Sequence, residues 1–299
     1  MKFSFWPAAS NRWEDTLALC QHVAETGWDG VWFADHFMPN TPEADGPTHE
    51  CWTTLAALAA SVPRVRIGAL VSGNTYRHPA VVANMARTID HVSGGRFVLG
   101  IGAGWQENEH RKYGIPFYTL RERLDRLEEA CQVIRALFEQ ERATFTGRYY
   151  RLEDAPLNPK PLQRPLPLLV GGGGERRTMR IAAQFADEWN TWGTPEVLAH
   201  KISVLEQHCR DLGRDPRSIR RSAQALVLIT EDAERAARAR SSGRPVIAGS
   251  EREIREALEA YARAGVDEFI VPDFNFPPDL EEKRAILDRF RRIAEPLHS

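Results

Sequence analysis

Short apolar runs rich in Val, Ile and Phe alternate along the whole chain with segments whose apolar residues recur every three or four positions. The first pattern predicts buried strands and the second predicts amphipathic helices. Strands that are separated by helices pair in parallel through right-handed crossovers. The predicted strands are Lys2–Trp6, Gly30–Phe33, Val65–Val71, Arg96–Ile101, Pro167–Val170, Glu188–Thr191, Ala223–Ile229 and Glu268–Pro272.

Eight such strands favour an α/β fold of the (β/α)8 TIM-barrel type, because closure of the sheet leaves no unpaired edge. An open doubly wound sheet is the alternative. That fold usually places a glycine-rich fingerprint after the first strand, whereas Trp6-Pro7-Ala8-Ala9 stands there in this chain. The helices are expected at Glu14–Glu25, Cys51–Ser61, Pro79–Val92, Leu120–Phe138, Glu175–Ala186, Val197–Leu212, Asp232–Arg240, Glu251–Ala264 and Leu280–Ile293.

The domain organisation is expected to be simple. No internal repeat or linker divides the 299 residues, so we predict one barrel domain over 1–299. Three excursions interrupt it, near 37–50, 105–119 and 143–166. The third contains Pro156, Pro159 and Pro161 and breaks both periodicities.

Composition excludes several classes of partner. The 39 Lys and Arg residues are balanced by 41 Asp and Glu, which argues against a generally cationic nucleic-acid binder. No apolar run approaches the roughly 20 residues of a membrane span, and the first ten residues are too short a run for a secretory signal. The four cysteines lack metal or redox spacing, so we expect buried thiols in a reducing, cytoplasmic compartment.

In a barrel the active site is built from residues that follow the strand ends. Asp35 and His36 follow the second predicted strand, and Gly102-Ala103-Gly104 follow the fourth. The glycines permit a planar ligand to approach the backbone. His36 beside Asp35 is a candidate for the pocket lining, with a structural histidine as the alternative.

Four consecutive glycines, Gly171-Gly172-Gly173-Gly174, lead from the fifth strand into a helix. Free backbone N–H groups at a helix start attract an anion, and glycines let it come close. Arg176 and Arg177 are unfavourable for the helix dipole at this position. A bound phosphate accounts for both features, and a flexible turn is the alternative.

Conventional catalytic side chains are not apparent. The chain has no HxH pair for a barrel metal site and no GxSxG nucleophile elbow, so no metal is expected. We therefore expect a bound cofactor to carry the chemistry while the protein supplies position and electrostatics.

A series of short motifs carries a family resemblance over nearly the whole chain. The chain resembles the bacterial luciferase-like flavin and deazaflavin oxidoreductases, and more closely their coenzyme F420-dependent branch. The motifs are LVSGNTYRHPA (70–80), SGGR (93–96), GIGAGW (100–105), TGRYY (146–150), APLNPKP (155–161), GGGGERRT (171–178) and ADEWN (186–190).

This resemblance implies a homodimeric barrel with the cofactor ring at the strand ends. It also implies a cis peptide bulge near Leu70-Val71, against which the ring rests, with Ser72 bonding the ring edge and Gly102–Gly104 nearby. The turn from Gly171 to Arg177 would then hold the phosphate. Arg77 or Lys160 would meet the acidic tail of F420.

One position departs from the family pattern. The sugar-phosphate dehydrogenases of the F420 branch carry a Glu proton donor where this chain has Trp105, which puts sugar-phosphate oxidation in doubt. Glu107 and Glu109 are candidates to replace it.

The leading functional hypothesis is hydride transfer between F420 and a small organic substrate, with His36 moving the accompanying proton and Trp105, Phe5 and Trp6 walling the substrate side. The alternatives are an FMNH2-dependent monooxygenase of the same fold and a non-catalytic flavin-binding barrel.

Overall fold

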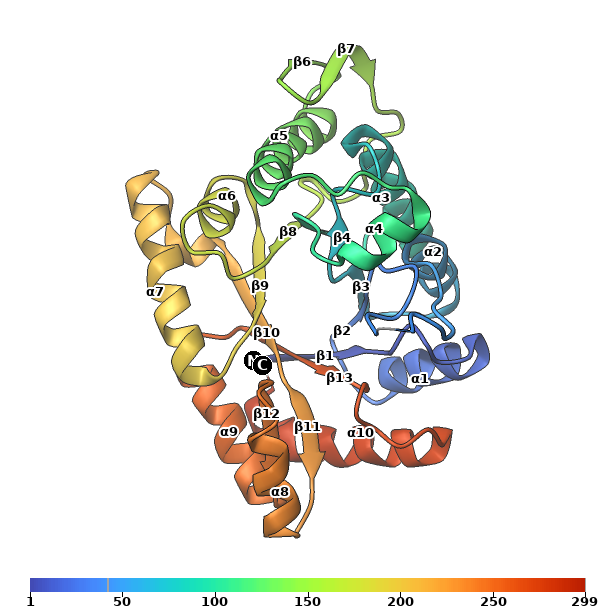
Figure 1. The fold of residues 1–299 in the computed structure, drawn as a ribbon, viewed down its shortest axis with the longest axis vertical. Coiled ribbons are helices and arrows are strands. Elements are labelled where there is room, and N and C mark those ends of the chain that lie inside the picture. The colour runs from blue at the N-terminus through green and yellow to red at the C-terminus, as the bar shows by residue number, and fades with distance from the viewer. Residues whose placement is uncertain (42, 299) are drawn as a thin grey trace.

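A parallel sheet that closes on itself forms the centre of the molecule (Figure 1). The computed structural model describes residues 1–41 and 43–298. Pairing of β3 with β5 completes the ring, and β4 continues β3 beyond residues 70–71. The predicted α/β barrel is confirmed. Its strands are, in spatial order, β3 (Arg66–Ala69), β2 (Gly30–Phe33), β1 (Lys2–Trp6), β13 (Glu268–Pro272), β10 (Arg220–Gln224), β9 (Glu188–Trp192), β8 (Leu168–Gly171), β5 (Phe97–Gly102) and β4 (Ser72–Gly73).

Helices surround the barrel on the outside (Figure 1). Two of them start with a capping box, formed by Thr119 with Glu122 and by Ser250 with Glu253. The helices are α1 (Trp13–Glu25), α2 (Cys51–Ser61), α3 (Pro79–Ser93), α4 (Glu107–Tyr113), α5 (Leu120–Glu139), α6 (Thr178–Phe185), α7 (Pro195–Asp211), α8 (Ala233–Arg240), α9 (Glu251–Arg263) and α10 (Leu280–Ala294), with 3₁₀ turns at Pro216–Ser218 and Glu295–Leu297.

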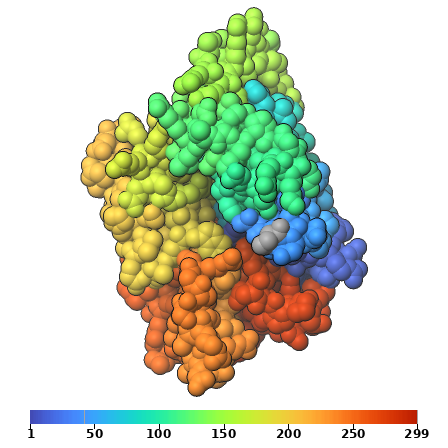
Figure 2. All heavy atoms as spheres, in the orientation of Figure 1, coloured from blue at the N-terminus to red at the C-terminus, as the bar shows by residue number. Residues whose placement is uncertain are grey.

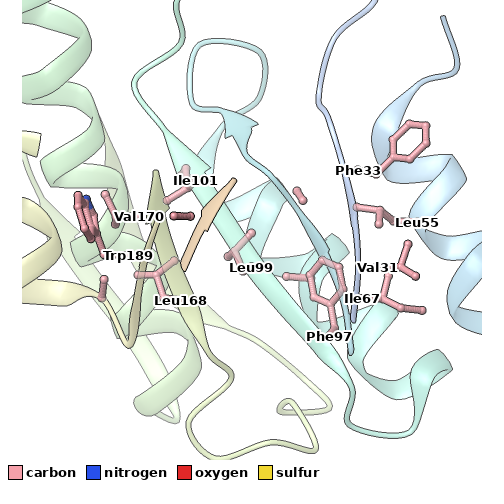
Figure 3. Packing of buried hydrophobic residues seen from close by; sticks show 14 of the residues in the cluster. Val31, Phe33, Leu55, Ile67, Phe97, Leu99, Ile101, Leu168, Val170 and Trp189 are labelled. Atoms are coloured by element: carbon pink, nitrogen blue, oxygen red, sulfur yellow. The ribbon is translucent and has the colours of Figure 1, made fainter. Parts of the chain in front are cut away.

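Alternation along the strands divides the core into two parts. One set of apolar side chains packs between sheet and helices, as Phe33, Phe97 and Leu55 do in Figure 3. The other set fills the barrel interior: Trp6, Trp32, Leu70, Val98, Leu169 and Ile270. Phe5 belongs to the outer set and packs edge-on against Trp28. The expectation that Phe5 walls the substrate side is therefore wrong, because adjacent strand residues face opposite ways.

The predicted strand Ala223–Ile229 is split in the structure. Only β10 joins the barrel, whereas β11 (Leu226–Ile229) pairs with β12 (Val246–Gly249) in a separate two-stranded sheet that carries α8. The helix expected from Glu175 begins at Thr178.

The excursions contain regular structure of their own. The second holds α4, and the third holds an antiparallel hairpin, β6 (Arg142–Thr146) with β7 (Arg151–Pro156), which projects from the barrel (Figure 1). Residue 42 of the first excursion and residue 299 lie outside the described residues. Among the helices described, none is long and apolar enough to cross a membrane.

Candidate active site

The C-terminal ends of the barrel strands surround a hollow in the surface, here called the barrel mouth, where the segments around α4, β9 and α8 meet (Figure 2). At its edge the Leu70–Val71 peptide bond is cis, as the family resemblance implied. Glycines make room for Val71: a Cβ on Gly102 would lie 2.8 Å from Val71 Cγ2, and one on Gly171 would lie 2.7 Å from Val71 Cγ1. The predicted site residues Leu70, Val71, Gly102 and Gly171 are therefore brought together.

Asp35 holds the chain that follows this bulge. Its Oδ2 accepts hydrogen bonds from Ser72 Oγ (2.9 Å), the Gly73 N–H (3.1 Å) and Arg77 Nη1 (2.7 Å). Asp35 is 1 % exposed. Burial raises the pKa of Asp35, and the Arg77 guanidinium opposes that shift. Every contact of Asp35 is internal, which suits a residue that positions its neighbours; its assignment as a catalytic group stays a prediction.

The Ser72 hydroxyl also has hydrogen-bond partners only within the protein. It donates to Asp35 and accepts from Trp52 Nε1 (3.2 Å), and Ser72 is fully buried. The hydroxyl thus has both a donor and an acceptor partner within the protein, and the expectation that it bonds the ring edge stays a prediction.

The two cations proposed for an acidic tail also have internal partners. Arg77 donates to Asp35 and, through Nη2, to Glu50 Oε1 at 2.6 Å. Lys160 donates to the Leu137 and Gln140 carbonyls at the C-terminal end of α5. Both cations therefore have partners within the protein, and their contact with an acidic tail stays a prediction.

His36 is paired with a carboxylate. Its Nδ1 lies 2.8 Å from Glu109 Oε1, while the Phe37 N–H donates to Glu109 Oε2 at 2.7 Å. Because an ionised carboxylate only accepts, Nδ1 carries the proton in this arrangement. None of the described residues bonds His36 Nε2, and the side chain is 24 % exposed. Nε2 is therefore the atom that can exchange a proton at the mouth.

Glu109 is fully buried and remains ionised. Burial raises its pKa, but hydrogen bonds from His36, Phe37 and Tyr76 outweigh this, and the resulting pKa lies below the ordinary value. Of the two acids considered as replacements at this edge, Glu109 therefore contacts the candidate proton carrier, whereas Glu107 is exposed.

Helix α4 positions this pair. The residue after Glu109, His110, bonds Thr75 Oγ1 and the Gln106 carbonyl, both at 2.7 Å, and stacks on Tyr76. The sequence analysis predicted an excursion near 105–119 and no helix within it. Acidic residues at the start of this segment, basic residues at its end and Gly114 directly after them were the available signals for a short helix.

The glycine turn, Gly171–Gly174, presents unpartnered donors. The Gly172 N–H bonds the Asn190 carbonyl, but within 1–41 and 43–298 no group accepts from the backbone N–H groups of residues 173–178. These donors precede α6, so they form a site suited to an anion. Lys201, missed in the sequence analysis, donates to the Gly173 carbonyl at 2.7 Å and pairs with Glu175 Oε1 at 3.2 Å.

The two arginines at this turn differ. Arg177 forms ion pairs with Asp125 and with Glu128 (2.9 Å) on α5, so its charge is balanced without a bound anion. The charge argument for Arg177 is corrected accordingly. Arg176 is exposed, without a partner among the described residues, and stays a candidate for contact with an anion.

Aromatic rings also follow the ends of β1, β9, β13 and β5 around the mouth. Trp6 lies 6.0 Å from Trp192 and 5.0 Å from Phe274, measured between ring centroids. Trp105 is 61 % exposed and meets His36 edge-on at 5.3 Å. Among the residues that the structure describes, no group of three or more His, Cys, Asp or Glu side chains is arranged to hold a metal ion.

Comparison with known proteins identifies the family of the chain. The profile of the family described as luciferase-like monooxygenase matches residues 1–249. The chain belongs to this family. The resemblance inferred from the motifs is thereby confirmed.

Curated relatives of this family member carry F420 in their names. An F420-dependent glucose-6-phosphate dehydrogenase of Kineococcus radiotolerans is 40 % identical over 151 residues, which cover 50 % of this chain and 44 % of the relative. An F420-dependent hydroxymycolic acid dehydrogenase of Mycobacterium tuberculosis is 31 % identical over 222 residues, covering 74 % and 61 %. The chain thus spans about half the length of the curated relatives it matches.

Solved structures of similar fold include an F420-dependent secondary alcohol dehydrogenase, with a TM-score of 0.85, 22 % identity and 98 % coverage of both chains. A monooxygenase from Streptomyces bottropensis has a TM-score of 0.82 at 20 % identity, with full coverage of both chains. At these identities the likeness establishes the barrel fold.

Proposed function

We propose that this protein is an F420-dependent oxidoreductase that transfers a hydride to or from a small organic substrate. The observation that carries the proposal is the row of unpartnered N–H groups at residues 173–178, one barrel strand away from the Leu70–Val71 bulge. The names of the curated relatives support F420 as the cofactor.

The residues present fit such a cofactor. The N–H groups at 173–178 would hold a phosphate, and Arg176 adds an exposed cation beside them. The backbone of Leu70, Val71 and Gly102–Gly104 would support the ring. Reduced F420, when bound, supplies the hydride.

The protein's own residues position the reactants and move the proton that accompanies the hydride. His36 gives or takes the accompanying proton at Nε2, and Glu109 keeps the proton on Nδ1 and stabilises the imidazolium that forms. Asp35, which is paired with Arg77, would hold the Ser72 hydroxyl and the Gly73 N–H next to the site of the ring.

Cofactor binding tests the proposal directly. We expect F420 fluorescence to be quenched on titration with the protein, and Gly174→Asp to weaken F420 binding at least about tenfold, because a carboxylate among the free N–H groups competes with the phosphate. Gly243→Asp is the matched control: a Cβ there would meet nothing within 4 Å, and because φ at Gly243 is +78° its folding is checked first. The F420 affinity of the folded variant should match the wild type. Unchanged affinity in a folded Gly174→Asp protein would reject this phosphate site.

The same titration, repeated with FMN, distinguishes an F420-dependent enzyme from the two alternatives. The fold is shared with monooxygenases, so tight FMN binding without F420 binding would favour an FMNH2-dependent monooxygenase. Cofactor binding without turnover of any acceptor would favour a non-catalytic barrel.

The proposal extends to organisation and location. Residues 1–299 are taken as one barrel domain. A groove of about 510 Å³ between α2 and α3 supports a homodimer; it is lined by Trp52, Ala56, Met85, Ile89 and the half-exposed Val81. All four cysteines are free and buried, which supports a reducing, cytoplasmic compartment.

A further inference from the structure

Helix α7 contacts the segment that leads into α6 with two side chains. Lys201 Nζ donates to the Gly173 carbonyl at 2.7 Å. A Cβ on Gly173 would lie only 3.3 Å from Lys201 Cε, so the absence of a side chain lets the lysine come this close. Two turns farther along α7, His208 Nε2 lies 2.7 Å from the Glu175 carbonyl. Because a carbonyl oxygen only accepts, His208 carries its proton on Nε2 in this contact.

The two neighbouring carbonyls in this row also have donors. The Gly172 carbonyl accepts a hydrogen bond from Trp189 Nε1 at 3.0 Å, on β9. The Gly174 carbonyl accepts one from the Met179 N–H at 3.0 Å, on α6. The carbonyl oxygens of residues 172–175 are therefore all bound within the protein.

Planarity of the peptide bond relates these carbonyls to the unpartnered N–H groups. In a trans peptide, the C=O of one residue and the N–H of the next lie in one plane and point in opposite directions. The peptide bonds from 172 to 176 are trans. Donors on the carbonyls of 172–175 therefore direct the N–H groups of 173–176 to the side away from those donors. These N–H groups have no acceptor in the described part of the chain.

From this geometry we infer that Lys201 and His208 are positioning residues for the phosphate of the cofactor: they orient the N–H groups of Gly174 and Arg176 without contacting the phosphate themselves. The inference rests on the proposed function. The charge of Lys201 is balanced by Glu175 Oε1 at 3.2 Å, so its contribution is a fixed donor and not an unpaired cation. A charged donor on the carbonyl also polarises the peptide, which strengthens the N–H on its other side.

Removal of either donor should weaken binding only of ligands that carry a phosphate. In fluorescence titrations we expect Lys201→Met to weaken F420 binding about tenfold or more, and His208→Phe about two- to tenfold, because a charged donor contributes more than a neutral one. Both variants should bind the corresponding 5-deazariboflavin, which lacks the phosphate and the tail, as the wild type does. Lys201→Arg keeps a charged donor and should recover most of the F420 affinity. Arg210→Met, which removes an exposed cation from the same helix, is the matched control and should change neither affinity.

Amide NMR of the ligand-free protein measures the orientation of the turn itself. Release of the Gly173 carbonyl in Lys201→Met should shift the amide resonance of Gly174, which belongs to the same peptide group. His208→Phe should in the same way shift the amide resonance of Arg176. Arg210→Met should move neither resonance.

The outcomes separate this inference from the proposed function. An equal loss of affinity for F420 and for 5-deazariboflavin would overturn the inference, because it would indicate general damage to the site. Unchanged F420 affinity in both donor variants, or unchanged amide resonances, would overturn it as well. Absence of F420 binding to the wild type overturns the proposed function instead. FMN and riboflavin then replace the deazaflavin pair, and the amide shifts test both donors in either case.

Discussion

At the scale of single residues, the pairing of His36 with Glu109 determines what the site can do. A buried carboxylate on Nδ1 leaves only Nε2 to exchange protons at the mouth. Glu109 does not reach the mouth itself, because it is fully buried. It therefore acts through His36 as a positioning residue.

Substitutions of His36 and of Glu109 should lower the rate of F420-dependent turnover by different amounts. We expect His36→Asn to lower this rate about 10²- to 10⁴-fold, the usual contribution of a positioned acid or base. Glu109→Gln should lower it less, by about ten- to a hundredfold, because the imidazole remains. F420 affinity should stay within about twofold in both variants.

A spectroscopic measurement distinguishes positioning from a general structural defect. Histidine ¹⁵N shifts should report the Nδ1–H tautomer of neutral His36 in the wild type and a mixture of tautomers in Glu109→Gln. Retention of the pure Nδ1–H tautomer in the variant would contradict the role given to Glu109.

Sequence patterns locate such residues but not their partners. The positions after strand ends correctly bring Asp35, His36, Val71 and Gly171 to one edge of the barrel. They cannot indicate that Asp35 bonds Ser72 and Arg77 instead of a ligand. Those contacts depend on side-chain directions that are set only when the neighbouring strands and loops pack.

At the scale of elements, β4 depends on a side chain from another strand end. Asp35 follows β2, and it binds both residues of β4, Ser72 and Gly73, together with Arg77. Three hydrogen-bond donors thus converge on one buried carboxylate. Removal of the Asp35 charge should weaken these contacts and so destabilise β4.

We expect Asp35→Asn to lower the free energy of unfolding by about 3 kcal/mol, because it breaks a buried ion pair while Arg77 keeps Glu50. Asp154→Asn, which breaks the exposed pair with Arg142 on the projecting hairpin, should cost much less. Urea denaturation measures both. Equal losses in the two variants would contradict the positioning role of Asp35.

Elements differ in how well the sequence predicts them. Lys2–Trp6, Gly30–Phe33 and Glu268–Pro272 match the structure at both ends, because apolar runs bounded by polar residues or glycine define them locally. No polar or glycine boundary in the sequence marks the point where β10 leaves the barrel sheet and β11 begins. The run from Ala223 to Ile229 is continuous, and only pairing with the distant β12 draws its second half out of the barrel.

At the scale of the whole molecule, a buried polar cluster joins five strands inside the barrel. Arg66 on β3 pairs with Glu188 on β9 and Glu268 on β13. Glu268 also accepts from Ser4 Oγ on β1 at 2.6 Å and Trp32 Nε1 on β2 at 2.8 Å. One oxygen of Glu188, Oε2, is buried without a partner among the described residues.

Because Glu188 is buried with one carboxylate oxygen unpartnered, the stability of the barrel should depend on pH in a predictable direction. Burial raises the pKa of Glu188 above its ordinary value, and nearby Glu268 adds to the shift against Arg66. A raised pKa in the folded state contributes stability at low pH that is lost as pH rises through it. Each unit of increase corresponds to about 1.4 kcal/mol.

Glu188→Gln removes this ionisation, so the unfolding free energy of the variant should rise relative to the wild type between pH 4.5 and 7.5. Glu109→Gln is the matched control. The pKa of Glu109 is lowered, so the stability that its ionisation contributes is complete above its ordinary pKa and is lost only below it, and the difference between this variant and the wild type should change little between pH 4.5 and 7.5. Urea denaturation of the three proteins at both pH values measures the differences. If the Glu188→Gln difference did not rise more than the Glu109→Gln difference, ionisation of Glu188 would not set the pH dependence.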